Sequence, residues 1–195
     1  MIQNRRTLAI IALCLMTAIP AKAWKGLRFN MDWGYRAAVY QSYSYNYIAE
    51  EGFRVDQHGQ EAIMNSNGLL NMFIGSQLGD HAELGIFSGY EGIRQDRRVI
   101  PLGLRANWLF RGADADGPMC YIEGGAAFHS DCKATGTGTV GAGWHLQLDH
   151  GAGLEFKIGI NLCGDHPPIK GVSKENFMKS DYTYGGVSMT VGISF

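Results

Sequence analysis

Apolar and polar residues alternate with a period of two along much of this 195-residue chain. The alternation is clear in GLRFNMDWGYRAAVY, from Gly26 to Tyr40, where the odd-numbered positions are almost all apolar. Three of the even-numbered positions are charged, namely Arg28, Asp32 and Arg36. Because successive side chains on a β-strand point to opposite faces, the stretch predicts a strand with one apolar and one polar face.

Seven further runs repeat this pattern between turn-forming residues. They cover Leu69–Gln77, Ala82–Glu91, Ile100–Phe110, Cys120–His129, Val140–Asp149, Leu154–Leu162 and Val187–Phe195. The links after the second, fourth and sixth runs are tight turns. The other links are mostly longer and polar, at Gln41–Met64, Ile93–Val99, Ser130–Thr139 and Cys163–Tyr182. Short turns at one end and longer loops at the other predict an all-β fold, an eight-stranded antiparallel up-and-down transmembrane β-barrel.

Two kinds of eight-stranded barrel fit the pattern, and they differ in which face is inside. A soluble lipocalin-like barrel turns its apolar face inward around a ligand, whereas a membrane barrel turns it outward to lipid. The polar faces here are rich in glycine and nearly balanced in charge, as a narrow lumen requires. We therefore expect the apolar face to meet lipid. The charged residues expected in the lumen are Arg28, Asp32, Arg36, Glu83, Glu91, Arg105, Glu123, Glu155 and Lys157.

Residues 1–23 have the features of a secretory signal peptide. Arg5 and Arg6 precede an apolar run, and an Ala-Lys-Ala cleavage site ends at Ala23. The apolar run is too short to span a bilayer as a helix. We expect residues 24–195 to form one barrel domain after cleavage. This mature chain has more acidic than basic residues, so nothing in it suggests a nucleic-acid partner.

The last run, VSMTVGISF, alternates strictly and ends on Phe195. Here the sequence resembles the small outer-membrane β-barrel proteins of Gram-negative bacteria, in which a terminal strand ending in Phe is the usual signal for the barrel insertion machinery. The segment YIEGGAAF, Tyr121–Phe128, also resembles the fifth strand of such proteins. The resemblance implies an outer-membrane location, contact with outer-membrane lipid and lipopolysaccharide, and a monomer. It implies an architecture more firmly than an activity.

The segment GTGTVG, Gly136–Gly141, matches the G-x-G-x-x-G pattern. A dinucleotide site needs a helix after this pattern, and here an alternating run follows. We therefore interpret it as a glycine-rich loop that enters the sixth strand.

The segment FHSD places His129, Ser130 and Asp131 together. Some small outer-membrane barrels are lipid A deacylases with a Ser–His–acid site, but their His-x-Ser-Asn motif is missing from the corresponding segment, Ile160–Pro168. The parity of His129 also points it to the lumen rather than to a lipid substrate. Residues adjacent in sequence rarely form a triad, because catalytic geometry is built across the fold. We assign no catalytic residue.

The segment CGDH, Cys163–His166, could supply metal ligands together with His58 or Cys132, but its spacing is not that of a recognised site. We expect no metal and no cofactor. The mature chain has an odd number of cysteines at irregular spacing, which is not a disulfide framework. A disulfide between Cys132 and Cys163 remains an alternative, because we expect the chain to be exported to a compartment in which disulfides form.

A tyrosine-rich segment, Tyr40–Phe53, continues the first strand into the longest link. Tyr43, Tyr45 and Tyr47 keep the period of two. One interpretation is an interfacial aromatic belt with a strand extension above the membrane. The other is a surface-exposed recognition edge for an extracellular ligand.

Eight-stranded barrels have interiors that side chains can fill. We therefore predict an outer-membrane barrel with a filled polar lumen and a non-enzymatic, structural or surface-interaction role. The alternatives are a lipid-modifying enzyme of the lipid A deacylase kind, a narrow pore, and a soluble lipocalin-like carrier. The sequence identifies neither a ligand nor a partner protein.

Overall fold

The computed structural model describes residues 26–94, 97–130, 133–148, 151–169, 172 and 176–195. The expected signal peptide, Asp131 and Cys132 lie outside the described residues. Eight strands form: β1 (Leu27–Ile48), β2 (Arg54–Gln77), β3 (Ala82–Arg94), β4 (Arg97–Leu109), β5 (Gly117–Phe128), β6 (Thr135–Gln147), β7 (Gly153–Asp165) and β8 (Phe177–Ser194). No helix in the described part of the chain is long and apolar enough to cross a membrane.

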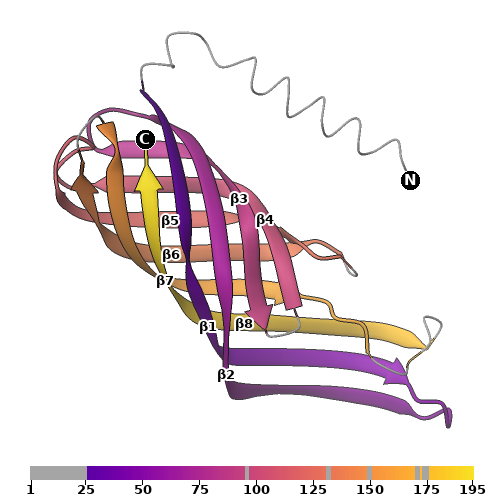
Figure 1. The fold of residues 1–195 in the computed structure, drawn as a ribbon. Helices are drawn as coiled ribbons and strands as arrows, with labels where there is room; N and C mark the ends of the chain where they lie inside the picture. The colour runs from indigo at the N-terminus through magenta and orange to yellow at the C-terminus, as the bar shows by residue number, and fades with distance from the viewer. Residues whose placement is uncertain (1–25, 95–96, 131–132, 149–150, 170–171, 173–175) are drawn as a thin grey trace, which may run out of the picture.

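The strands pair in chain order, each antiparallel to its neighbours, and β1 closes the ring with β8 (Figure 1). On β1, Trp33 lies opposite Leu70 of β2 and opposite Val191 of β8. The N–H of Phe195 donates to the carbonyl of Phe29 at 2.8 Å, which completes the seam at the chain end. The predicted eight-stranded antiparallel up-and-down barrel is confirmed.

Side-chain exposure decides which face of the barrel is inside. Large apolar side chains stand on the outer surface, such as Leu104, Ile158 and Met189, which are 59%, 58% and 63% exposed. Charged side chains such as Asp32 and Arg105 lie in the interior, each only 2% exposed. A lipocalin-like carrier needs the reverse arrangement. The soluble alternative is therefore wrong.

Several strands run further than the hydrophobic pattern predicts. The segment Gln41–Met64, expected to be the longest link, belongs to β1 and β2 except for residues 49–53. The expected links at Ile93–Val99, Ser130–Thr139 and Cys163–Tyr182 are also partly strand. The predicted contrast between short turns and long loops is thus wrong. What distinguishes one end of the barrel is the projection of β1, β2 and β8 past the other strands (Figure 1).

The projecting parts of β2, β1 and β8 form a three-stranded sheet, which we call the extension (residues 40–48, 54–62 and 177–185). Its central strand is β1, where Tyr43 lies opposite Gly59 of β2 and opposite Tyr182 of β8. β2 forms one edge of the extension, because it pairs with β3 only from Leu69 onward. On the opposite edge, β8 keeps its pairing with β7 as far as Tyr182. The extension therefore continues one wall of the barrel and has two open edges only beyond Tyr182.

A β-bulge in β1 lies where the barrel wall passes into the extension. Ala38 pairs with Gly186 and Tyr40 pairs with Gly185, which are consecutive residues of β8. Val39 is therefore an extra residue of β1 with no partner on β8. An extra residue reverses the face on which all later side chains of the strand lie. The lumen side of β1 is therefore even-numbered up to Ala38 and odd-numbered beyond Tyr40, which brings to the lumen side Tyr43, Tyr45 and Tyr47.

Candidate functional site

Arg105 of β4 lies at the centre of the lumen between two carboxylates. Its Nη1 is 2.7 Å from Asp32 Oδ2, and its Nη2 is 2.5 Å from Glu123 Oε1. The rings of Phe73 and Phe87 lie 5.4 and 5.7 Å from its guanidinium carbon, within the range of cation–π contact. Ion pairing and ring contact together compensate for the hydration that this buried cation loses.

Lys157 of β7 joins Asp32 to a second carboxylate. Its Nζ lies 2.7 Å from Asp32 Oδ1 and 2.8 Å from Glu155 Oε2. The side-chain amide of Asn30 also donates to Glu155 at 2.8 Å, and His145 Nδ1 is 3.5 Å from the other oxygen of that carboxylate. Asp32 is thus shared by two cations, so the pairs form one network rather than separate bridges.

The other charges expected in the lumen pair locally. Arg36 Nη1 is 3.1 Å from Glu91 Oε2, and Arg28 Nε is 3.5 Å from Glu83 Oε1. The structure therefore brings all nine of these residues into the interior, each within 3.5 Å of an opposite charge. The cavity left among the central ones is about 20 Å³, enough for about one water molecule.

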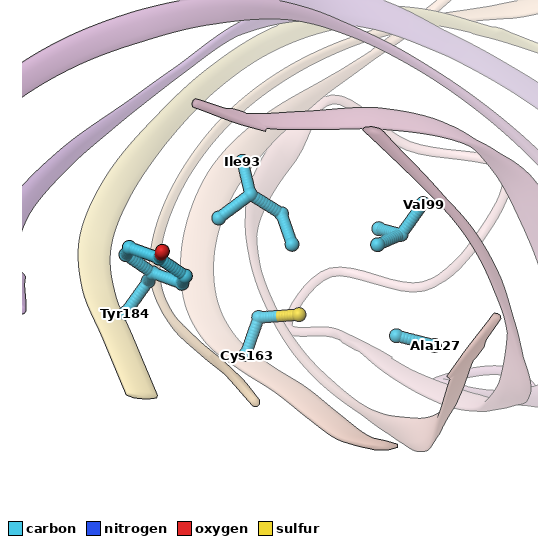
Figure 2. Close-up of a cluster of buried hydrophobic side chains, with 5 residues drawn as sticks. All are labelled: Ile93, Val99, Ala127, Cys163 and Tyr184. Carbon is cyan, nitrogen blue, oxygen red and sulfur yellow. The ribbon is translucent and has the colours of Figure 1, made fainter. Parts of the chain in front are cut away.

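An apolar layer crosses the lumen between this charge network and the extension. Figure 2 shows its five side chains, one each from β3, β4, β5, β7 and β8, pointing toward one another across the interior. They are at most 1% exposed: Ile93, Val99, Ala127, Cys163 and Tyr184. Ile63 and Tyr182 pack against the layer from the side of the extension. Side chains thus fill the lumen at two levels, with paired charges at one and apolar groups at the other.

Asp165, at the end of β7, anchors the rim just beyond the apolar layer. Arg97 donates to its two oxygens from Nε at 2.9 Å and from Nη2 at 2.6 Å. His129 Nδ1 lies 3.4 Å from the same carboxylate. On its other side, His129 Nε2 is 3.4 Å from the hydroxyl of Thr135, which donates to the carbonyl of Gly164 at 2.7 Å. The His129 and Asp165 side chains are 1% and 0% exposed, so their contacts tie strand ends together.

Five tyrosines form a ladder along the lumen-side face of the extension. Consecutive ring centroids are 5.8–6.2 Å apart and the ring planes differ by 20–29°, in the order Tyr47, Tyr45, Tyr43, Tyr182 and Tyr184. The Tyr43 ring covers Gly59, where an added Cβ would lie 2.6 Å from the phenolic oxygen. The Tyr45 hydroxyl donates to the side-chain oxygen of Gln57. The ladder therefore ties β1 to β8 by stacking, while Tyr43 and Tyr45 also contact β2 at Gly59 and Gln57.

The opposite face of the extension is polar. Arg54 Nη2 lies 3.6 Å from Asp56 Oδ2, and both side chains are about 60% exposed (61% and 59%). Lys179 Nζ lies 2.6 Å from Asp181 Oδ2, and His166 Nδ1 lies 2.8 Å from Asp181 Oδ1. Such a surface suits water and not lipid.

A pocket of about 400 Å³ lies between the extension and the barrel rim; we call it the rim pocket. The residues 167–169 of the β7–β8 connection form part of its wall, together with Ser180. Its aromatic and charged walls are Tyr45, Tyr47, Tyr182, Tyr184, Arg94 and Arg97. Burial and the neighbouring Tyr43 and Tyr47 raise the pKa of Tyr45, and burial, then Tyr45, raises the pKa of Tyr182. Both phenols are therefore neutral at ordinary pH.

The structure does not assemble the short sequence motifs into sites. The segment Gly136–Gly141 is part of β6 itself, not a loop that enters it. His129 contacts Asp165 and Thr135, whereas the side chain of its sequence neighbour Ser130 is exposed. No group of three potential metal ligands occurs among the described residues, and Cys163 belongs to the apolar layer.

The sequence interpretation named three members of the tyrosine ladder but missed Tyr182 and Tyr184. A signal was present, because both continue the even-numbered lumen positions of β8 upstream of Gly186. It also missed Arg94 and Arg97, and it considered Asp165 only as part of the CGDH segment. These lie at strand ends, where the hydrophobic pattern fades and gives no clue to which side chains meet.

No family model and no curated protein matches this chain. Among solved structures, the outer membrane protein OprG from Pseudomonas aeruginosa is 13% identical, with 87% of this chain and 96% of that one covered and a TM-score of 0.54. The chain has the fold of the small eight-stranded outer-membrane β-barrel proteins. Neisserial surface protein A and the outer membrane protease OmpT from Escherichia coli are 9% and 11% identical over the same shares, with TM-scores of 0.49 and 0.43. At these identities the likeness concerns the fold alone.

Proposed function

We propose that the protein is a closed, non-conducting barrel of the outer membrane that holds the extension outside the bilayer for contact with a ligand. Its role in this proposal is non-enzymatic. The observation that carries it is the change of polarity along β1. Apolar side chains such as Trp33 stand outward on the barrel, while beyond Val39 the outward side chains are polar, as at Ser44 and Asn46.

Lipid is the solvent that this outer surface of the barrel fits. Exposed apolar side chains surround it on every strand, and a mid-bilayer Lys or Arg at such a position costs roughly 2–4 kcal/mol. Aromatic side chains of the kind found at membrane interfaces also stand outward, among them Tyr90, Trp108 and Phe195. In this proposal the barrel insertion machinery also recognises β8 together with Phe195, which follows it.

The filled lumen supports the non-conducting part of the proposal. An ion would have to displace the pairs of Arg105 and Lys157 and then pass the apolar layer around Cys163. Apolar constrictions block conduction because water leaves them. A pore would need both barriers to open together.

The first experiment refolds residues 24–195 from urea into detergent micelles. We expect the unboiled protein to migrate faster on a gel than the boiled one, and to add no current steps to a planar lipid bilayer. A chain that folds without any amphiphile would contradict the membrane location. Current steps would contradict the closed lumen.

The apolar layer gives a finer test through the thiol of Cys163. In a background with Cys120→Ser and Cys132→Ser, a water-soluble thiol reagent should leave Cys163 unmodified. Tyr184→Ala opens the layer on the side of the extension and should make the thiol reactive. Equal labelling of the two proteins would argue against the seal.

The orientation is tested with trypsin on intact cells that express the protein. Arg54 is exposed at the far end of the extension, whereas Lys157 is enclosed in the barrel. We expect cleavage after Arg54 and survival of a barrel fragment that contains Lys157. Protection of Arg54 in intact cells with cleavage after lysis would place the extension on the periplasmic side.

A further inference from the structure

We propose that the rim pocket binds an acidic saccharide, a chain of sugar rings that carries carboxylates. The proposal deepens the proposed function and rests on it, because it takes the extension to lie in water outside the membrane. The pocket volume of about 400 Å³ falls within the roughly 300–1,000 Å³ of small-ligand sites. A soluble ligand can enter from the extension side without crossing the apolar layer.

The charged groups in the pocket wall select for an anion. Arg94 and Arg97 belong to the wall, and no Asp or Glu occurs among its described lining residues. Asp165 lies behind Arg97 with no exposed side-chain surface, and its two contacts fix the plane of that guanidinium. A guanidinium held in one orientation matches the planar, two-oxygen geometry of a carboxylate.

The tyrosines can contact the parts of a sugar ring other than its carboxylate. A sugar ring has an apolar face of C–H groups and a rim of hydroxyls. Tyr45, Tyr47 and Tyr182 offer both flat apolar surface and phenolic hydroxyls at the pocket wall. The rings of Tyr45 and Tyr47 lie 6.2 Å apart, and those of Tyr182 and Tyr184 also lie 6.2 Å apart, with Tyr43 between the two pairs. This spacing suits several linked sugar rings better than one.

A single-stranded nucleic acid also uses aromatic rings and arginines. Two features of this chain favour the saccharide. The sequence is acidic overall, with 18 Asp and Glu against 17 Lys and Arg, and a phosphate backbone calls for a continuous basic groove. Among the described residues of the pocket wall only Arg94 and Arg97 are basic, which is too few for such a groove but enough for the carboxylates of a short saccharide.

Binding is measured by calorimetry on the refolded barrel in detergent micelles. The probe is a tetramer of galacturonate, and the control ligand is a neutral galactose tetramer of the same length. We expect the acidic tetramer to bind at least about tenfold more tightly, with an affinity that falls as salt is added, since screening weakens charge recognition. Equal affinities for the two tetramers, or no binding of either, would overturn the proposal.

Two matched pairs of variants locate the site. Arg94→Gln and Arg54→Gln each remove one positive charge, but only Arg94 belongs to the pocket wall. Tyr47→Ala and Asn46→Ala alter opposite faces of the same strand. We expect Arg94→Gln and Tyr47→Ala to weaken binding about tenfold each, and Arg54→Gln and Asn46→Ala to leave it within about twofold. Equal losses within either pair would mean that binding does not occur in the rim pocket.

The outcomes separate this inference from the function on which it rests. A heat-modifiable, non-conducting barrel that binds no acidic tetramer would contradict the saccharide proposal and would agree with the proposal of a closed barrel. A barrel that conducts but binds the tetramer with the expected variant pattern would contradict the proposal of a closed lumen and support the proposed saccharide site. Tighter binding of a single-stranded oligonucleotide than of the acidic tetramer would replace the saccharide with nucleic acid.

Discussion

The barrel and the extension are built from the same strand, β1, with opposite arrangements of polarity. In the barrel, Trp33 points outward and Asp32 points into the lumen. In the extension, Tyr45 lies on the lumen side and Asn46 on the outer side. The reversal occurs at the single extra residue Val39. One β-bulge therefore lets one strand present an apolar outer face in the barrel and a polar outer face in the extension.

The two regions also differ in what holds them together. The barrel interior depends on buried ion pairs, in which Arg105 and Lys157 satisfy carboxylates that lie away from water. The extension depends on stacked tyrosines and on exposed pairs such as Arg54 with Asp56. Buried pairs are costly to break on one side only, while exposed pairs contribute little. The same substitution should therefore have very different effects in the two regions.

The largest difference is expected for removal of an arginine from each region. Arg105→Met leaves Glu123 without its cation in the lumen and should lower the free energy of unfolding by about 3–5 kcal/mol. Arg54→Met removes an exposed pair, whose loss typically costs about 0–1 kcal/mol. Both are measured by urea unfolding of the micelle-bound barrel, with the unboiled gel band as the readout of the folded state.

A double variant separates charge from packing in that result. Arg105→Met with Glu123→Gln removes the uncompensated carboxylate, and Asp32 keeps Lys157 at 2.7 Å. We expect this protein to regain most of the lost stability. If it stays as unstable as Arg105→Met alone, the contact of Arg105 with the Phe73 and Phe87 rings, and not its charge, holds the lumen together.

A smaller difference is expected when a lysine is added to each outer surface. Ile158 is 58% exposed in the middle of β7, where a lysine facing lipid should cost roughly 2–4 kcal/mol. Gln60 stands on the polar outer face of the extension, where Gln60→Lys should change stability by less than about 0.5 kcal/mol. The comparison is made by unfolding in lipid vesicles. Equal effects would mean that both surfaces meet the same solvent.

The fold could be predicted from the sequence because the period of two is a local property of each strand. Alternation between Leu27 and Val39 already separates the two faces, and the glycine-rich polar face already indicates a crowded lumen. The parity rule also placed residues as distant as Arg28 and Lys157 on one side of the sheet. It could not say which of them meet, because pairs such as Asp32 with Arg105 depend on strand tilt and register around the barrel.

The extension could not be predicted, because its strands do not show an unbroken alternation of apolar and polar residues. An unbroken period of two assigns Tyr43 to the apolar outer face of β1, but the bulge at Val39 reverses the parity and places Tyr43 on the inner face. The strand character of Arg54–Ala62 comes from pairing with β1 and from the cover that Tyr43 gives to Gly59, and not from a hydrophobic pattern. The rim pocket in turn requires Arg94 and Arg97, at the adjoining ends of β3 and β4, to face the projecting parts of β1 and β8, and only the closed barrel fixes that arrangement.

The smallest expected difference between the two regions is their response to alkaline pH. Tyr45 and Tyr182 have pKa values raised above the ordinary 10.0, because burial disfavours the phenolate and the neighbouring tyrosines of the ladder repel it. The neutral phenols are therefore favoured in the folded extension, and their contribution is fully present below pH 10.0. As the pH rises through 10.0 toward the raised values, the unfolded segment ionises first and the extension loses stability. We expect the near-ultraviolet circular dichroism of the stacked tyrosines to fall in this window while the gel mobility of the barrel is unchanged. Tyr45→Phe removes one ionisable group and should move the loss of the circular dichroism signal to higher pH. If the barrel and the extension instead unfold at the same pH, the ladder is not an independent unit.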